Sequence, residues 1–412
     1  MSKRVEPEIE TFARIRVVGV GGSGCNAINH MITSKVRGVE FVAVNSDAQD
    51  LHRALSKRKI HIGKNLTRGL GTGMNPDLGK RAAEETRQQI QETLQGSDMV
   101  FITCGMGGGT GTGASAVVAK IAKEVGALVI AIVTKPFSFE GAQRKDIAER
   151  GLAELKKEVD AFIVIPNDKL LTVVDKTLSL KQAFALCDEV LREAVEGVSD
   201  IIRTPGDINT DFNDIKAVME GAGPTLMGIG IAEGDERAKE AAQRAVNSPL
   251  LDISISGAKG VLWVVAHSDD LGIMEVHEAS KIISESVDKN AKIIWGVMKD
   301  DKLKKGQVRI IVIATGFPES AAHASHSGSE RSLFSMSGEK REEDRGRIYH
   351  EILKRDEKLD VKSEKEKAEP VVKDKEEPIV TATPHKREVT PPAPEDDETW
   401  GAIPAFLRRH KK

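Results

Sequence analysis

The chain has 412 residues and a formal net charge of −3 at pH 7. Its length allows two ordinary domains with well-buried cores, and the near balance of charge excludes the strong basic field of many nucleic-acid-binding proteins. The three cysteines (Cys25, Cys104 and Cys187) lie far apart and form no C-x-x-C pair, which argues against a disulfide framework or a zinc site. Because the first residues lack the apolar segment of a signal peptide and no apolar run is long enough to span a bilayer, we expect a soluble, cytoplasmic protein.

The first two hundred residues alternate strand-like and helix-like segments. Short runs rich in β-branched residues predict buried strands at 15–20, 41–45, 99–104, 128–134 and 162–166. Between these runs, apolar residues recur at helical spacing. This alternation predicts a doubly wound, Rossmann-like α/β domain with a mostly parallel sheet, which we place at 14–178 after a flexible N-terminal extension at 1–13.

A single long helix is predicted to follow. Apolar residues keep helical period from Leu180 to Ile202, and a Pro-Gly pair then supplies the stop. Such a helix spans about 35 Å, which is enough to join the first domain to a second one. We assign 179–206 to this central helix and 207–317 to a second, α+β domain, whose strand-like runs lie at 260–266, 293–297 and 308–314.

The end of the chain has a different composition. Residues 318–398 are rich first in serine and then in lysine, glutamate and proline, with too few apolar residues for a core, so we predict a disordered linker. Residues 399–412 form a short apolar and basic segment, which we predict to be a partner-binding peptide. The alternative is a chance cluster of apolar residues at a disordered end.

Two glycine-rich segments each follow a predicted strand and precede a predicted helix. The first, at 19–24, fits the G-x-G-x-x-G pattern, in which glycines let a phosphate approach the backbone at a helix N-terminus. Taken alone, it fits a dinucleotide-binding fold equally well. The second, GGGTGTG at 107–113, interleaves five glycines with two threonines, which is far more than a turn needs. Together the two loops predict a polyphosphate held from both sides, without a P-loop lysine.

These segments resemble the tubulin/FtsZ family of GTPases. GGGTGTG is the signature of that family, and the resemblance covers about residues 14 to 317 and a terminal motif. The other matching motifs are VGVGGSGCNAI at 18–28, GLGTGMNP at 69–76, VTKPFSFEG at 133–141, IPNDKL at 165–170, NTDFND at 209–214 and IPAFLRR at 403–409. The resemblance implies GTP or GDP as the ligand, with Mg²⁺ bound through the phosphates and not by side chains. Ser23 and Cys25 are small residues where the family often has glycine or alanine.

The resemblance also assigns nucleotide-binding residues position by position. The two glycine loops would hold the phosphates, residues 71–73 would contact the γ-phosphate side, and Glu140 and Arg144 would lie at the ribose and phosphate edge. The alternative for the last two is a surface pair four residues apart on a helix. The full predicted set is Gly21, Gly22, Ser23, Gly24, Cys25, Asn26, Asp47, Gly71, Thr72, Gly73, Gly107, Gly108, Gly109, Thr110, Gly111, Thr112, Thr134, Glu140, Arg144, Asn167, Phe184 and Asp188.

The base would be read from the start of the long helix. Phe184 and Asp188 are four residues apart and share one helix face. An aromatic ring there can stack on a base, and a carboxylate can accept two hydrogen bonds from the N1–H and 2-amino groups of guanine. By resemblance, Asn167 and Asn26 complete this pocket. For Phe184 alone, the alternative is packing in the core.

The predicted catalytic residues, Asn209, Asp211 and Asp214, lie beyond the other end of the long helix. A separation of about 35 Å by helix rise keeps these carboxylates from the nucleotide loops of their own chain. They would instead reach the GTP of a neighbouring subunit and orient or polarise the attacking water. Helix capping by Asp211 is the alternative.

The resemblance implies a GTP-dependent polymerising protein of the bacterial division ring, located at mid-cell beneath the inner membrane. Its partners would be copies of itself and a divisome membrane-anchor protein, with no nucleic acid and only indirect membrane contact. The residues that would bind the anchor are Ile403, Pro404, Phe406, Leu407 and Arg408. Two alternatives stay open. One is a non-polymerising tubulin-like GTP switch, and the other is an NAD-dependent dehydrogenase in which Glu40 or Asp47 would read a ribose.

Overall fold

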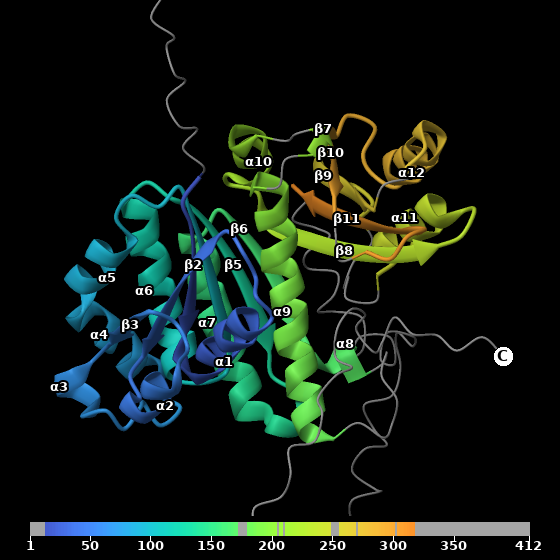
Figure 1. Ribbon diagram of the computed structural model, residues 1–412. Helices are drawn as coiled ribbons and strands as arrows, with labels where there is room; N and C mark the ends of the chain where they lie inside the picture. The colour runs from blue at the N-terminus through green and yellow to red at the C-terminus, as the bar shows by residue number, and fades with distance from the viewer. Residues whose placement is uncertain are drawn as a thin grey trace, which may run out of the picture. The chain divides into compact units, whose positions relative to one another are not determined.

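A computed structural model describes a large part of the chain (Figure 1). The described residues are 13–171, 179–203, 206–208, 211–248, 255–268, 271–300 and 303–317. The predicted linker and terminal peptide lie outside these residues, as does the predicted N-terminal extension except for residue 13.

The first part of the sheet is parallel. Its strands are β1 (Ile15–Val20), β2 (Val39–Asn45), β3 (Arg58–His61), β4 (Met99–Gly105), β5 (Leu128–Lys135) and β6 (Ala161–Pro166). Their order, β3-β2-β1-β4-β5-β6, is that of the doubly wound dinucleotide-binding folds. The predicted fold class is therefore confirmed. The sequence does not predict β3, because the four residues of this edge strand include an arginine, a lysine and a histidine.

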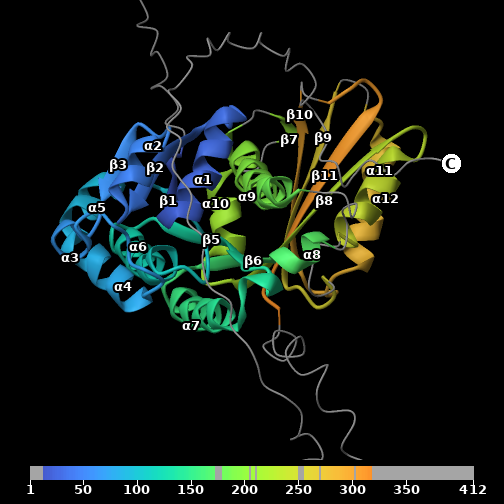
Figure 2. The same ribbon diagram turned by 90° about the horizontal axis from the view of Figure 1, so that it is seen from below.

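Helices cover both faces of this parallel part (Figure 2). They are α1 (Gly21–Thr33), α2 (Ala48–Arg53), α3 (Lys64–Thr67), α4 (Pro76–Glu85), α5 (Arg87–Leu94), α6 (Thr110–Glu124), the 3₁₀ turn η1 (Ser138–Glu140), α7 (Ala142–Glu158) and α8 (Asn167–Leu171). In β1, Ile15 and Val17 face a core shared with α1, whereas Val18 and Val20 face a core shared with α6. Side chains of a strand alternate between faces, so a strand buried on both faces has the continuous apolar sequence that predicts it.

Helix α9 (Leu180–Arg203) has 24 residues, which corresponds to a length of about 36 Å. Its buried apolar side chains belong to the core of β1 and α1, and that core also includes Leu262 and Ile311 of the second domain. One apolar core therefore connects the two domains through α9. Contrary to the sequence pattern, Leu180 and Phe184 are 62% and 42% exposed. Both lie in the first six residues of the helix, and among these six only Ala183 is buried.

The second domain is an α+β unit, as predicted. Its elements are β7 (Gly206–Ile208), α10 (Phe212–Met219), β8 (Gly223–Glu233), α11 (Arg237–Val246), β9 (Gly260–His267), α12 (Ile273–Glu285), β10 (Lys292–Lys299) and β11 (Gln307–Thr315). The strand order is β8-β11-β9-β10-β7, with β11 antiparallel to both of its neighbours. Two residue pairs between β6 and β8 join this part to the parallel sheet. Helices α11 and α12 share a separate core with β9 and β11.

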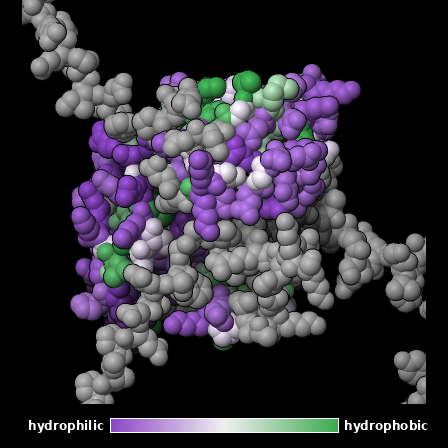
Figure 3. Space-filling view, turned by 45° about the vertical axis from the view of Figure 1, so that its right-hand side comes forward, coloured by the Kyte–Doolittle hydropathy of each residue, from purple (hydrophilic) through white to green (hydrophobic). Residues whose placement is uncertain are grey.

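One face of the described residues is largely polar. On this face, hydrophilic side chains are the majority, and a group of hydrophobic side chains lies at its upper edge (Figure 3). Among the helices of the described residues, none combines the length and the hydropathy that a membrane span requires.

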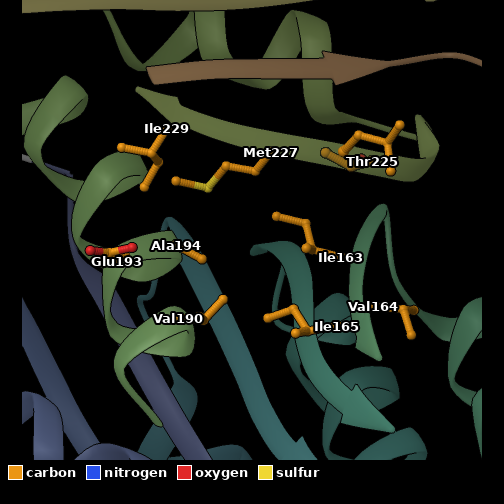
Figure 4. A pocket seen from close by; sticks show the side chains of 10 residues that line it. Ile163, Val164, Ile165, Val190, Glu193, Ala194, Thr225, Met227 and Ile229 are labelled. Carbon is orange, nitrogen blue, oxygen red and sulfur yellow. The ribbon is translucent and has the colours of Figure 1, made fainter. Parts of the chain in front are cut away.

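A narrow apolar cavity of about 30 Å³ lies between β6, α9 and β8 (Figure 4). Glu193 of α9 is the one charged residue in a lining that otherwise consists largely of apolar side chains such as Ile165, Val190 and Met227. Burial, together with the charge of Glu189, raises the pKa of Glu193 to about 7, although arginine side chains oppose the shift. The cavity shares no lining residue with the glycine-rich loops.

Candidate nucleotide-binding site

The two glycine-rich segments lie side by side at the centre of the parallel sheet. One connects β1 to α1 and the other connects β4 to α6, and β1 and β4 are neighbouring strands. The strand order reverses here, because the chain continues to β2 and β3 on one side and to β5 and β6 on the other. Ligands of open α/β sheets bind at such a switch point, outside the carboxyl ends of the strands. The loops are in contact, since a Cβ on Gly21 would lie 2.7 Å from the backbone N of Gly111.

Both helices that start at this crevice have uncapped N-termini. Helix α1 begins at Gly21 and α6 begins at Thr110, and neither N-cap residue makes a side-chain hydrogen bond to the first turn. Neither first turn contains an acidic residue. The first four backbone N–H groups of a helix lack an intrahelical acceptor, and the helix dipole is positive at that end. Two such termini at one crevice form a site for a polyanion.

Glycine is required where the second loop meets a neighbouring segment. A Cβ on Gly109 would lie 2.2 Å from Thr72 Oγ1, so any side chain there would separate the two segments. Gly107 has a φ of 98°, and its N–H donates to Thr112 Oγ1 at 2.9 Å. In contrast, a Cβ on Gly108 would meet no atom within 4 Å. The backbone at Gly108 is therefore open to a ligand.

The first loop leaves other predicted residues accessible. Gly22, Ser23 and Asn26 are exposed, whereas Gly24 and Cys25 are buried against the sheet. Burial raises the pKa of the Cys25 thiol to about 12, so this side chain is a packing group and not a reactive thiolate.

A third segment, residues 68–74, lies against the start of α6. Positive φ angles recur along it, at Arg68, Gly69, Gly71, Gly73 and Met74. Arg68 (52°) and Met74 (62°) are not glycine, so their surroundings must hold them in a conformation that side chains disfavour.

A cluster of hydroxyl groups connects this segment to α6 and to the turn after β2. Thr72 Oγ1 lies 3.1 Å from Thr110 Oγ1, and Ser46 Oγ lies 2.6 Å from the same Thr110 oxygen. Thr72 and Thr110 belong to the predicted site. Ser46 does not, because no sequence motif distinguishes it from a serine in an ordinary turn.

Two carboxylates stand beside these loops, and the sequence predicts one of them. Asp47 caps α2 by accepting hydrogen bonds from the backbone N–H groups of Gln49 and Asp50. Asp50, which the sequence does not predict, accepts a hydrogen bond from Asn45 at 2.7 Å and lies next to Gly22. Burial, together with the charge of Asp47, raises the pKa of Asp50. The sequence signal that could have identified Asp50 is its spacing of three residues from Asp47, directly after a predicted strand.

The residues assigned to the ribose edge lie beside the second glycine loop. Glu140 and Arg144 form an ion pair at 2.8 Å, which is the pairing that the sequence left as the alternative. Glu140 also accepts a hydrogen bond from the backbone N–H of Phe137 at 2.9 Å. The carbonyl oxygen of Arg144 would lie 2.9 Å from a Cβ on Gly107, and Thr134 is buried at the end of β5. Their contact with a ribose stays a prediction.

The predicted base-reading residues come from three helices. Asn26 lies on α1, Asn167 begins α8, and Phe184 and Asp188 lie on α9. Asn167 is 4% exposed, and its Oδ1 has no hydrogen-bond partner among the described residues. Buried acceptors are nearly always satisfied in folded proteins, so this oxygen suits a ligand that brings a donor.

The aromatic and acidic residues of α9 differ in their surroundings. The Phe184 ring packs edge-on against Phe137, with the ring centroids 5.4 Å apart. Burial raises the pKa of Asp188 to about 6, and the nearby His30 opposes that shift. His30 Nε2 lies 2.7 Å from a carboxylate oxygen of Glu189, so a side-chain contact links α1 to α9 beside the predicted pocket.

The predicted catalytic carboxylates lie far from the glycine loops along the chain. Asp211 and Asp214 stand at the start of α10, which follows the C-terminal end of α9 (Figure 1). They form a capping box, in which Asp211 Oδ1 accepts from the Asp214 N–H at 2.8 Å and Asp214 Oδ2 accepts from the Asp211 N–H at 3.4 Å. The capping alternative is therefore present in the structure, and the catalytic role stays a prediction. Asn209 lies outside the described residues.

A doubly wound sheet with two uncapped helix N-termini at its switch point defines a nucleotide-binding α/β protein. Residues 14–175 match the GTPase domain of the Tubulin/FtsZ family, and residues 223–318 match the C-terminal domain of the FtsZ family. The chain therefore belongs to the Tubulin/FtsZ family of GTPases and is FtsZ-like in both domains. The dehydrogenase alternative is thereby removed.

Solved structures agree with this assignment. The chain is similar to FtsZ from M. jannaschii, solved as a dimer, at 48% identity and a TM-score of 0.71, over 74% of this chain and 89% of that one. A point mutant of the same M. jannaschii protein matches at 47% identity and a TM-score of 0.71, over 75% and 92%. CetZ2 from Haloferax volcanii, solved as a GTPγS-bound protofilament, shares the fold at 22% identity and a TM-score of 0.65, over 76% and 96%.

Proposed function

We propose that the chain binds GTP at the crevice between the two glycine-rich loops. The observation that carries this proposal is the pair of uncapped helix N-termini, α1 and α6, side by side at the switch point of the sheet. The polyphosphate lies across these termini, where backbone N–H groups and two helix dipoles offset its charge. The base lies toward α9, where Asp188 accepts from the guanine N–H groups and Asn167 Oδ1 gains the donor that the described residues do not supply.

Mg²⁺ is expected to bind through phosphate oxygens. The described residues hold no group of three or more His, Cys, Asp or Glu side chains arranged to bind a metal ion. Bound to the phosphates, Mg²⁺ would neutralise part of their charge. Asp47 and Asp50, which lie beside Gly71 and Gly22, would be available as acceptors for water bound to that ion.

We further propose that the chain polymerises head to tail and that the contact completes the catalytic site. In support, α9 continues from Asp188 to Arg203, which puts about 23 Å of helix between the base-reading residues and the segment that leads to Asp211 and Asp214. Asp211 is exposed and Asp214 partly exposed, so the carboxylate oxygens that the capping box does not use can orient a water in a neighbouring subunit's site. The relatives with solved structures include a dimer and a protofilament. A contact between two different faces does not close on itself, so it produces filaments.

A sedimentation assay with GTP, GDP and ATP, combined with phosphate release, tests the proposal. We expect pelleting and phosphate release with GTP alone. Specific activity should rise from near zero with protein concentration, because a lone subunit lacks half of its site. GTP binding without pelleting at any protein concentration would instead favour a non-polymerising switch. A turnover per molecule that stays constant down to nanomolar protein would contradict a catalytic site shared between subunits.

In the cell, we propose that these filaments form the division ring at mid-cell, on the cytoplasmic side of the inner membrane. The terminal motif at 403–409 would bind a membrane-anchor protein, and the linker at 318–398 would provide the reach. Imaging of a fluorescent fusion in dividing cells tests this location. A uniform distribution during division would contradict it.

A further inference from the structure

The side chain of Ser46 connects a buried turn to the candidate phosphate site. The residue follows β2 and is fully buried, at 0% exposed. Among the described residues, its hydroxyl has one hydrogen-bond partner, Thr110 Oγ1, at 2.6 Å. The Thr110 oxygen in turn lies 3.1 Å from Thr72 Oγ1. A chain of three hydroxyls therefore leads from a buried turn, through the first residue of α6, to the strained segment at 68–74.

Proton counting shows what this chain can do. Each hydroxyl has one proton to donate and two lone pairs to accept with. If Ser46 and Thr72 both donate to Thr110, both lone pairs of Thr110 are used, and its own proton is left to point at a third group. A terminal phosphate oxygen accepts and does not donate, so it selects this arrangement. Hydrogen bonds that feed into a donor strengthen the bond that it makes.

We propose that Ser46 is a positioning residue for the γ-phosphate of GTP. It directs the Thr110 hydroxyl proton toward the phosphate and, through the shared oxygen, couples the phosphate to Thr72 in the 68–74 segment. Thr72 packs directly against α6, because Gly109 has no side chain to intervene. GDP lacks the γ-phosphate, so it leaves the chain without its selecting acceptor. This inference rests on the proposed function, since it requires GTP to lie at the start of α6.

The test compares GTP and GDP affinities of the intact chain, measured by displacement of a fluorescent nucleotide at protein concentrations too low for assembly. Ser46→Ala should weaken GTP binding about two- to tenfold, the range for one neutral hydrogen bond, and should change GDP binding less than twofold. Equal loss for GTP and GDP would overturn the proposal. If the unaltered chain failed to bind GTP, the proposed function itself would fall. The two failures are thus distinguishable.

Ser46→Thr separates the hydroxyl from simple packing. Because Ser46 is fully buried, a packing role predicts that the added methyl group harms more than the smaller alanine does. The proposal predicts the opposite order: Ser46→Thr keeps the hydroxyl and should have a GTP-to-GDP affinity ratio close to that of the unaltered chain, whereas Ser46→Ala should have a lower ratio. The matched control is Ser56→Ala, which removes another buried hydroxyl whose partner is the backbone oxygen of Arg58. It should leave the ratio unchanged.

A double-mutant cycle with Thr72→Val tests the shared oxygen. Both substitutions remove a donor to the same Thr110 hydroxyl, so their effects on GTP affinity should be coupled, and the double variant should differ from the sum of the two singles. Strict additivity would overturn the coupling between Ser46 and the 68–74 segment. Thermal melts of every variant confirm that differences in affinity are not due to unfolding.

Discussion

Replacing Glu193 tests whether a buried carboxyl at the boundary between the two domains makes the free energy of unfolding depend on pH. Its side chain is only 11% exposed and contributes the one charge to the apolar cavity between β6, α9 and β8. Arg192 lies 3.8 Å away, but that arginine also pairs with Glu189 and Glu196. Replacing Glu193 by glutamine keeps the shape of the side chain and removes its ionisation.

The expected size follows from the pKa. Burial raises the pKa of Glu193 from 4.5 to about 7 in the folded chain, and each tenfold change in proton affinity corresponds to about 1.4 kcal/mol. Between these two values the folded chain binds more protons than the unfolded chain, so stability falls as the pH rises. Once the pH is well above 7, stability has fallen by about 3 kcal/mol in total, and about 2 kcal/mol of this fall lies between pH 5.5 and pH 8.5.

Urea unfolding at several pH values measures this difference. Relative to the unaltered chain, Glu193→Gln should gain about 2 kcal/mol of unfolding free energy between pH 5.5 and pH 8.5, with most of the gain below pH 7. Glu285→Gln, at the exposed end of α12, is the matched control and should show no such trend. A stability difference that is independent of pH would show that Glu193 does not retain its proton on folding, and the reasoning from burial would then be wrong.

Other consequences of the site can be measured on the same protein. GTP affinity should be full above pH 7 and should fall as the pH drops below about 6, because burial raises the pKa of Asp188 to about 6 and only the ionised carboxylate accepts both guanine N–H bonds. Asp188→Asn should bind GTP weakly and should lose this pH dependence. If the variant showed the same GTP affinity and pH dependence as the unaltered chain, Asp188 would not be part of the pocket. Asp211→Ala and Asp214→Ala should each retain GTP affinity in a dilute binding assay while hydrolysis falls by orders of magnitude, and lost affinity would contradict a site shared between subunits. Deleting residues 400–412 should leave GTPase activity and pelleting nearly intact while abolishing recruitment to vesicles that carry the membrane anchor. Recruitment equal to that of the intact chain would refute the role of the tail.

The sequence predicts the parallel sheet and the glycine loops because both depend on local patterns. A strand buried on both faces must be apolar along its length, as β4 and β5 are, and a loop that packs against another backbone must be glycine, as at Gly21 and Gly109. The polar edge strand β3 is not predicted from the sequence, because it has too few apolar residues to form a recognisable strand pattern. Ser46 and Asp50 are not predicted as site residues, because their place in the site depends on contacts with residues distant in the sequence, and no local sequence pattern shows these contacts.

Periodicity also exaggerates how much of α9 is buried. Leu180 and Phe184 follow the apolar pattern of the helix but lie where it contributes few buried side chains. A period identifies the side of a helix that faces apolar neighbours, but it does not report where those neighbours end. Phe184 packs one edge against Phe137 but stays 42% exposed, and that exposed part of the ring is what stacking on a base requires.

The core that runs through α9 also limits how this chain can be divided. Side chains of β1, α9 and β11 belong to one apolar cluster, so cutting the chain on either side of the helix would expose apolar surface on both fragments. A shortened protein for biophysical work should therefore keep both domains and α9 together and lose only the ends of the chain. For the same reason, recombination between relatives should succeed at the ends of the chain more readily than on either side of α9, where the exchanged parts would inherit mismatched packing surfaces.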